Sequence, residues 1–163
     1  MPKRPQLESD IEHLDAFIGI SSHLRDYRLA YQINQLPGFT LQKTDDLPAF
    51  SAMADKFAGY ACYTFNDDEK QLKYFLLSNT GSKGLLVPSQ KEAGYFLLIR
   101  GLLDSGAEAA IVAQLKTIPN VLTAYAIDQH KIPNIENLLS DLELHEINLK
   151  RNSKAKSADS GSF

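Results

Sequence analysis

The sequence lacks the residues and runs that define several large classes of protein. Cys62 is the only cysteine among 163 residues, so no internal disulfide can form, and this usage is typical of a reducing compartment. No apolar run approaches the roughly 18 residues needed to cross a bilayer, and the first residues lack the apolar stretch of a secretion signal. We therefore expect a cytoplasmic protein that does not insert into a membrane.

Motifs for common metals and cofactors are also missing. The four histidines show neither H-x-H nor H-x-x-x-H spacing and have no cysteine partners. The acidic run at 67–69 lacks the ligand spacing and the central glycine of a calcium loop. The stretch GSKG at 81–84 lacks the length and the following helix of a phosphate-binding loop, and no G-x-G-x-x-G occurs. The sequence thus predicts no metal and no cofactor.

The charge is unevenly divided. The first five residues hold two basic residues, and the tail KRNSKAKSADSGSF at 150–163 holds four against one acid. The remaining body has 11 basic and 19 acidic residues, a net charge of −8, which repels phosphate backbones. We therefore do not expect nucleic-acid binding, apart from a weak contact by the basic tail. That tail has almost no apolar residues, which predicts disorder.

Length and composition favour one domain. With 163 residues, of which 44% are hydrophobic, the chain can bury a single core. We divide it into an N-terminal extension at 1–14, a single α+β domain at 15–149, and the disordered basic tail at 150–163.

The segment 85–127 reads as strand, helix, strand. An apolar run at 94–101 has the length of a strand, and Ser105 with Glu108 predicts a capping box before a helix. Ile111, Leu115 and Ile118 share one face of that helix, and Pro119-Asn120 ends it. A second unit has the same order: a strand at 15–22, a helix capped by Ser21 or Ser22 and ended by Pro37-Gly38, and a strand at 39–43.

The rest of the chain supplies a hairpin and a last helix. Residues 57–65 and 73–78 are predicted to pair across a polar turn at 66–70. An apolar stripe marks a C-terminal helix that packs on the sheet, and its members are Ile135, Leu138, Leu139 and Leu142. We therefore predict an α+β fold with a mostly antiparallel sheet. Two β-α-β units, helices on one face and an inserted or extending hairpin would give a ferredoxin-like, two-layer sandwich.

Three stretches resemble a small bacterial family named for the signature IPExxxVDY. They are LVPSQKEAGYFLLIRG, FIGISSHLRDYRLAYQIN and YFLLSNTG. The resemblance spans residues 15–127, and the signature positions here are Val87, Pro88, Ser89, Ala93, Gly94 and Tyr95. Only Pro88 and Tyr95 match, Val87 replaces Ile, and the Glu, Val and Asp of the pattern are absent. The resemblance implies no activity, because that family has no assigned function.

Candidate site residues gather at the first predicted strand-helix junction. Arg25, Asp26 and Arg28 can contact an anion or a partner where free backbone N–H groups point outward, and a plain surface ion pair is the alternative. Ser22, His23 and Asp26 combine the groups of a catalytic triad, but a triad needs convergence from separate elements. An N-cap and a solvated turn explain them better.

Two classes of function follow. The first is a non-catalytic binding or self-associating module with a protein partner or a second copy, the contact using the aromatic hairpin or the apolar final helix. The alternative is a small enzyme or a metabolite-binding regulatory domain with a site near the junction, using Asp26, Arg28 and Tyr95.

Overall fold

A computed structural model of the protein describes the backbone of residues 14–51 and 56–161 and the side chains of residues 14–49 and 58–152. One six-stranded sheet forms its centre, and every pair of neighbouring strands is antiparallel. In spatial order the strands are β10 (Val121–Ala126), β1 (Ala16–Ser22), β9 (Tyr95–Gly101), β6 (Leu72–Ser78), β5 (Cys62–Asp67) and β2 (Gln42–Lys43). The predicted α+β class with a mostly antiparallel sheet is confirmed.

Short elements and helices complete the described residues. Two small two-stranded sheets pair β3 (Leu47–Ser51) with β4 (Lys56–Tyr60) and β7 (Thr80–Gly81) with β8 (Gly84–Leu85). The α-helices are α2 (Asp26–Ile33), α3 (Ala107–Lys116) and α4 (Ile135–Gly161), and the single-turn 3-10 helices are η1 (Pro88–Gln90) and η2 (Gln129–Lys131). None of the helices among these residues combines the length and the apolar character that crossing a bilayer requires.

Two crossovers interleave in the sheet. Strand β1 pairs antiparallel with both β9 and β10, so β9 and β10 run parallel to each other on either side of it. Strand β9 likewise separates β1 from β6, which also run parallel. The strand predicted at 39–43 is shorter than expected, because only Gln42–Lys43 pair, at the far edge beside β5. The first crossover therefore returns to the centre of the sheet at β6.

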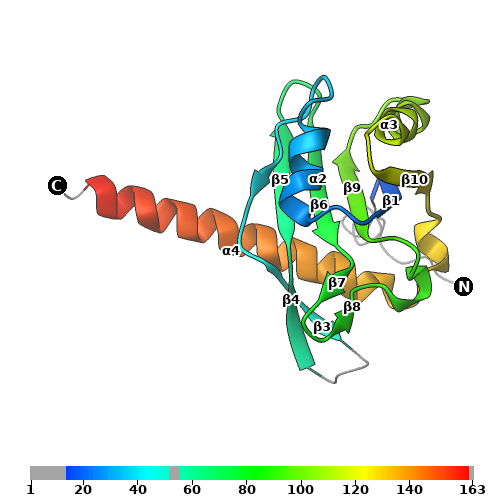
Figure 1. Cartoon of the computed structure of the whole chain (residues 1–163). Coiled ribbons are helices and arrows are strands. Elements are labelled where there is room, and N and C mark those ends of the chain that lie inside the picture. The colour runs from blue at the N-terminus through cyan, green and yellow to red at the C-terminus, as the bar shows by residue number, and fades with distance from the viewer. Residues whose placement is uncertain (1–13, 52–55, 162–163) are drawn as a thin grey trace, which may run out of the picture.

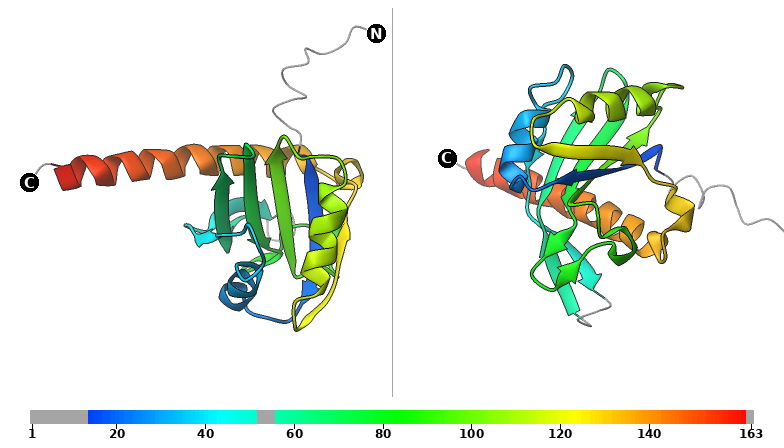
Figure 2. Two further views of the ribbon diagram at one scale, coloured as in Figure 1. Left: turned by 90° about the horizontal axis from the view of Figure 1, so that it is seen from above. Right: turned by 45° about the vertical axis from the view of Figure 1, so that its right-hand side comes forward.

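The sheet is covered on both faces, which corrects the expected two layers. Figure 2 shows α2 and α3 on one side of the sheet and α4 on the other. Ile18 and Leu97 pack among the buried residues of α2 and α3, whereas Phe17 and Phe96 pack with the stripe of α4 and with β3 and β4. Alternate side chains of a strand point to opposite faces, so each central strand contributes to two separate cores.

The helix starts differ from the predicted caps. Helix α3 begins after Gly106, which has a φ of 84°, and no side chain caps it. Because glycine adopts positive φ without strain, it makes this entry where Ser105 and Glu108 were predicted to form a capping box. Helix α2 begins after Arg25, also without a side-chain cap, so neither Ser21 nor Ser22 is its N-cap.

The predicted hairpin exists in part. Strands β5 and β6 pair from Cys62 with Leu77 to Asp67 with Leu72. The run at 57–65 breaks at Ala61, however, and β4 leaves the main sheet to pair with β3. Most aromatics of this region are core residues, since Tyr63, Tyr74 and Phe75 are buried.

Helix α4 is much longer than its apolar stripe. The stripe itself is buried as predicted, in the core that α4 shares with β3 and β4. The helix then continues to Gly161 and projects past the body of the protein (Figure 1). The backbone of the tail is therefore helical up to that residue, where the sequence predicted disorder. Lys150 and Arg151 are exposed on this projecting part.

Candidate functional site

The junction between β1 and α2 is held by Ser22. Its hydroxyl accepts a hydrogen bond from the backbone N–H of Leu24 at 3.1 Å and donates one to the carbonyl of Asn120 at 2.8 Å. The second bond joins the end of β1 to the turn before β10. Ser22 therefore ties together the first strand-helix junction and the second crossover.

The hydroxyl groups of two tyrosines form hydrogen bonds at the same junction. The Tyr63 hydroxyl donates to the Asp26 carboxylate at 2.7 Å, and the Tyr95 hydroxyl donates to the Leu24 carbonyl at 2.5 Å. Burial raises the pKa of Tyr63, and the neighbouring Asp26 raises it further. Burial, together with the charge of Asp26, raises the pKa of Tyr95 to about 12, although Arg25 opposes the shift. Both phenols therefore stay protonated at neutral pH.

The four predicted site residues divide into two groups. Arg25 and Asp26 lie close enough to Tyr95 for their charges to act on its phenol, but Asp26 and Tyr95 are already engaged in internal hydrogen bonds. Arg28 is exposed on α2, as are its neighbours Tyr27 at 60% and Tyr31 at 62%. The hydrogen bonds of Asp26 and Tyr95 therefore hold the junction together, and Arg25 and Arg28 are exposed on its surface.

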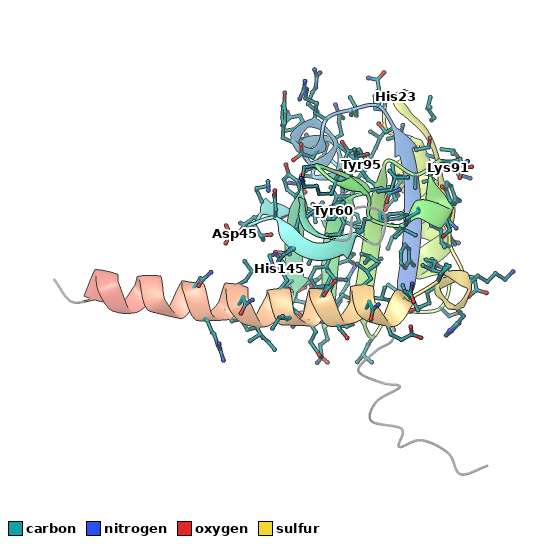
Figure 3. The ribbon with its side chains drawn as sticks, turned by 90° about the horizontal axis from the view of Figure 1, so that it is seen from below. His23, Asp45, Tyr60, Lys91, Tyr95 and His145 are labelled. Carbon is teal, nitrogen blue, oxygen red and sulfur yellow. The ribbon has the colours of Figure 1, made fainter. Side chains whose placement is uncertain are left out.

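The groups named as a possible triad bond elsewhere. Ser22 bonds to Leu24 and Asn120, and Asp26 bonds to Tyr63, so no chain of hydrogen bonds runs through His23. The side chain of His23 is exposed, and Figure 3 places it at the rim of the molecule, away from Tyr95.

A pocket that the sequence did not reveal lies on the other face of the sheet, the one that α4 covers. It occupies about 470 Å³ between the segment 85–89 and the start of α4. We call it the Val87 pocket, and its lining consists of Leu85, Leu86, Val87, Pro88, Ser89, Ile132, Pro133, Asn134, Ile135 and Leu138. None of these side chains carries a charge. This size and apolar character are those of small-molecule sites in proteins.

One wall of the Val87 pocket is fixed by Asn79. This residue is fully buried, and its side-chain oxygen accepts from the N–H of Val87 at 2.8 Å. Its side-chain nitrogen donates to the carbonyls of Gln90 at 3.0 Å and Ala93 at 2.9 Å. A buried amide with its partners in place holds a loop rigidly, so the segment from Val87 to Ala93 is pre-shaped.

The opposite wall is the first part of α4. Polar contacts further along this helix hold it against the sheet. Glu146 forms ion pairs with Lys73 on β6 and Arg100 on β9. Burial favours the neutral acid, but the two cations outweigh it and lower the pKa of Glu146. The ring nitrogen Nε2 of His145 lies 3.0 Å from the carbonyl oxygen of Asp45, and Figure 3 shows these two residues in the same region, beside α4. Burial lowers the pKa of His145.

Other reactive groups are placed where chemistry is disfavoured. Cys62 is buried, and burial raises the pKa of its thiol to about 11, so the thiol is protonated and inert. Within the described part of the chain, no three His, Cys, Asp or Glu side chains are grouped to hold a metal ion.

Three residues of the Val87 pocket were named from the sequence, but for another reason. Val87, Pro88 and Ser89 are signature positions of the family resemblance, and they form part of its wall. Gly94, where the signature has Asp, lies so close to β1 that a Cβ there would come within 2.9 Å of the Ser22 carbonyl oxygen. The close backbone approach explains why this chain has glycine there. The contribution of 132–138 could not be read from the sequence, because it comes from a distant segment.

Comparison of the chain with known protein families, with curated proteins and with solved structures finds no match.

Proposed function

We propose that this protein is a non-catalytic binding module that takes an uncharged, mainly apolar small molecule in the Val87 pocket. The observation that carries the proposal is the combination of an apolar cavity of about 470 Å³ with a wall already fixed by Asn79. A pre-formed apolar site loses little conformational entropy when it binds a ligand. Ser89 and Asn134 supply the polar groups that orient the ligand.

The lining also supports a binding role over a catalytic one. Acid-base and nucleophilic catalysis need a titratable group within hydrogen-bond reach of the substrate. The ten lining residues include no acid, base, cysteine or histidine, and Ser89 has no such partner among them. Affinity in such a site comes from burial of apolar surface.

The test uses the neutral fluorescent probe N-phenyl-1-naphthylamine, which brightens when it leaves water. We expect the wild-type chain to bind it, and Ser89→Trp to weaken binding at least about fivefold, an effect of roughly 1 kcal/mol, because the indole fills the cavity. Ser82→Trp, which changes another exposed serine outside the lining, is the matched control.

The melting temperature of each variant, followed by circular dichroism, separates lost binding from lost folding. Equal probe binding by Ser89→Trp and the wild type would contradict the proposal. A loss of probe binding in Ser82→Trp as large as that in Ser89→Trp would also contradict it.

A small enzyme or metabolite site at the β1-α2 junction is the second candidate, with Asp26, Arg28 and Tyr95 as its residues. It has less support, because Asp26 and Tyr95 already bond to Tyr63 and Leu24. The exposed Arg25 and Arg28 support an anion or partner contact there.

We also propose that the core of the fold is ferredoxin-like. In chain order its elements would be β1, α2, β6, β9, α3 and β10, with β2 to β5 inserted after α2. The strand order β10-β1-β9-β6 and the placement of α2 and α3 on one face support this assignment. Fold alone implies no particular activity.

Membership of the IPExxxVDY family and a cytoplasmic location remain proposals that rest on the sequence. The single cysteine, which is buried, supports a reducing compartment. The acidic body supports a protein or small-molecule partner over nucleic acid, and a weak contact of the basic tail with RNA remains a proposal. We further propose that the protein acts as a homo-oligomer, which the outer side of β10, unpaired among the described strands, supports.

A further inference from the structure

Strand β10 leaves one edge of the main sheet open. Among the described residues, β10 pairs with β1 on one side and with no strand on the other. The N–H of Ile127 donates to the Phe17 carbonyl on β1 at 2.7 Å. Backbone groups alternate in direction along an antiparallel strand, so the N–H and C=O groups of Ala124 and Ala126 point outward. This edge is a template for another strand.

From Thr123 onward, the sequence of β10 contains nothing that blocks such pairing. The strand reads VLTAYA, with no charged residue and no proline, the usual devices that protect an edge. Leu122 is 67% exposed, at an irregularity of the pairing near the start of the strand. An added strand therefore meets neither like charge nor a missing donor.

Helix α3 provides a second surface beside this edge. Figure 2 shows α3 lying along β10 on one face of the sheet. A groove of about 390 Å³ between them is lined by Glu108, Ala109, Val112, Ala113, Lys116 and Ala126. Ala109 and Ala113 are exposed and one turn apart, and such small residues let another backbone approach closely.

The charges of this groove are complementary to themselves. Glu108 lies in the first turn of α3 and Lys116 in the last, about 12 Å apart along the helix at 1.5 Å per residue. A two-fold axis perpendicular to the sheet would set α3 antiparallel to its copy. Each Glu108 would then face the second copy's Lys116, with Val112 near the axis.

We propose that the outer edge of β10 and the adjoining face of α3 form a homodimer interface, in which the sheets of two copies join into one continuous sheet. A register that pairs Ala124 with the second copy's Ala126 makes four backbone hydrogen bonds across the axis. The contact is isologous and closed, so it stops at a dimer. The inference rests on the proposed self-association and is independent of the Val87 pocket.

Charge reversal on the full-length chain tests the proposal. Sedimentation equilibrium of the wild type between 5 and 200 µM is expected to show a dimer. Lys116→Glu should raise the dissociation constant at least about fivefold, because it creates two Glu–Glu contacts. The double variant Glu108→Lys with Lys116→Glu should restore dimerisation. Lys150→Glu, on the far-side helix α4, is the matched control with the same change of charge.

A steric variant provides a second measurement. Ala113→Arg places a long charged side chain in the contact and should raise the dissociation constant at least about tenfold. Melting temperatures at low concentration show whether each monomer still folds. A wild-type monomer at 200 µM would overturn the proposed self-association. A wild-type dimer that Ala113→Arg and Lys116→Glu leave unchanged would overturn this interface alone.

Discussion

The two faces of the main sheet are covered in different ways. On one face, α2 and α3 are the helices of two crossovers and pack on the strands that flank them in sequence. On the other, α4 arrives from the end of the chain and packs together with the excursion β3-β4. Each helix of the first face lies between two strands of the sheet in chain order, whereas α4 follows the last strand and is joined to the sheet at one end only.

The polar contacts of the two faces differ in chemical kind, although all of them join residues far apart in sequence. On the α2 side, the Asp26–Tyr63 and Tyr95–Leu24 bonds lie at the edge, where the helix starts. On the α4 side, Glu146 reaches back to Lys73 and Arg100 on the sheet itself. Such specific contacts fix the position on the sheet of a helix that has no short connection to the neighbouring strands. The α4 face thus relies on ion pairs where the α2 face relies on hydrogen bonds of tyrosine hydroxyls, and the α4 face also contains the Val87 pocket.

The largest expected effect tests whether the two faces form one cooperative unit. Leu115→Ala on α3 and Leu142→Ala on α4 each remove a buried side chain, so each should lower the free energy of unfolding by about 2–5 kcal/mol. Urea denaturation, followed by circular dichroism and by tyrosine fluorescence, measures this change. Leu144→Ala, at a position on α4 that is 58% exposed, should change the free energy by less than about 0.5 kcal/mol.

Coincident transitions for both probes are expected in each variant. A separate early transition in Leu142→Ala, absent from Leu115→Ala, would show that α4 unfolds on its own and would break the comparison.

A smaller effect tests the ion pairs of the α4 face. The Glu146 side chain is 15% exposed, and Glu146→Gln leaves two partly buried cations without their acid. Because those cations keep some access to water, the free energy of unfolding should fall by about 1–2 kcal/mol at pH 7, below the cost of breaking a fully buried pair. Asp46→Asn, which breaks the exposed pair with Lys43, is the control and should have almost no effect.

The direction of the pH dependence follows from the lowered pKa of Glu146. The folded state holds the ionised form more tightly than the unfolded state, so this stabilisation is complete above the ordinary glutamate pKa and is lost as the pH falls below it. The stability difference between the wild type and Glu146→Gln should therefore shrink on acidification below about pH 4.3. A difference that stays constant down to pH 3 would show that the loss is not electrostatic.

The smallest effect concerns the projecting part of α4. Removing residues 151–163 should change the melting temperature by less than about 2 °C, because the last buried residue among the described side chains of α4 is His145, and Arg151 and Asn152 are exposed. Differential scanning calorimetry of the shortened and full chains measures the change. A fall of several degrees would mean that this part of α4 contributes to the folded body after all.

Periodicity and turn residues predicted the local elements well. The strand at 94–101, the face of α3 and the stripe of α4 depend on residues a few positions apart, and all appear in the structure. The predicted capping box is absent, because Gly106 precedes α3 with a positive φ. Helix propensities do not describe this backbone conformation. The strand at 39–43 is reduced to Gln42 and Lys43, because the side chain of Asn34 occupies both backbone hydrogen-bonding groups of Leu41.

The candidate site was less accessible to sequence reasoning. Arg25, Asp26 and Arg28 were recognised as a cluster, but the partner that engages Asp26 is Tyr63, 37 positions away. The Val87 pocket joins two segments more than 40 positions apart. No sequence pattern in either segment predicts its contact with the other segment.

What the sequence alone determined is the α+β class, the antiparallel sheet and the buried stripes, because apolar spacing follows the repeat of the backbone itself. Only the tertiary structure decided that α4 lies on the opposite face from α2 and α3, that β3 and β4 leave the main sheet, and that 85–89 meets 132–138. Those outcomes depend on how whole elements pack, and packing depends on shapes brought together from distant parts of the chain.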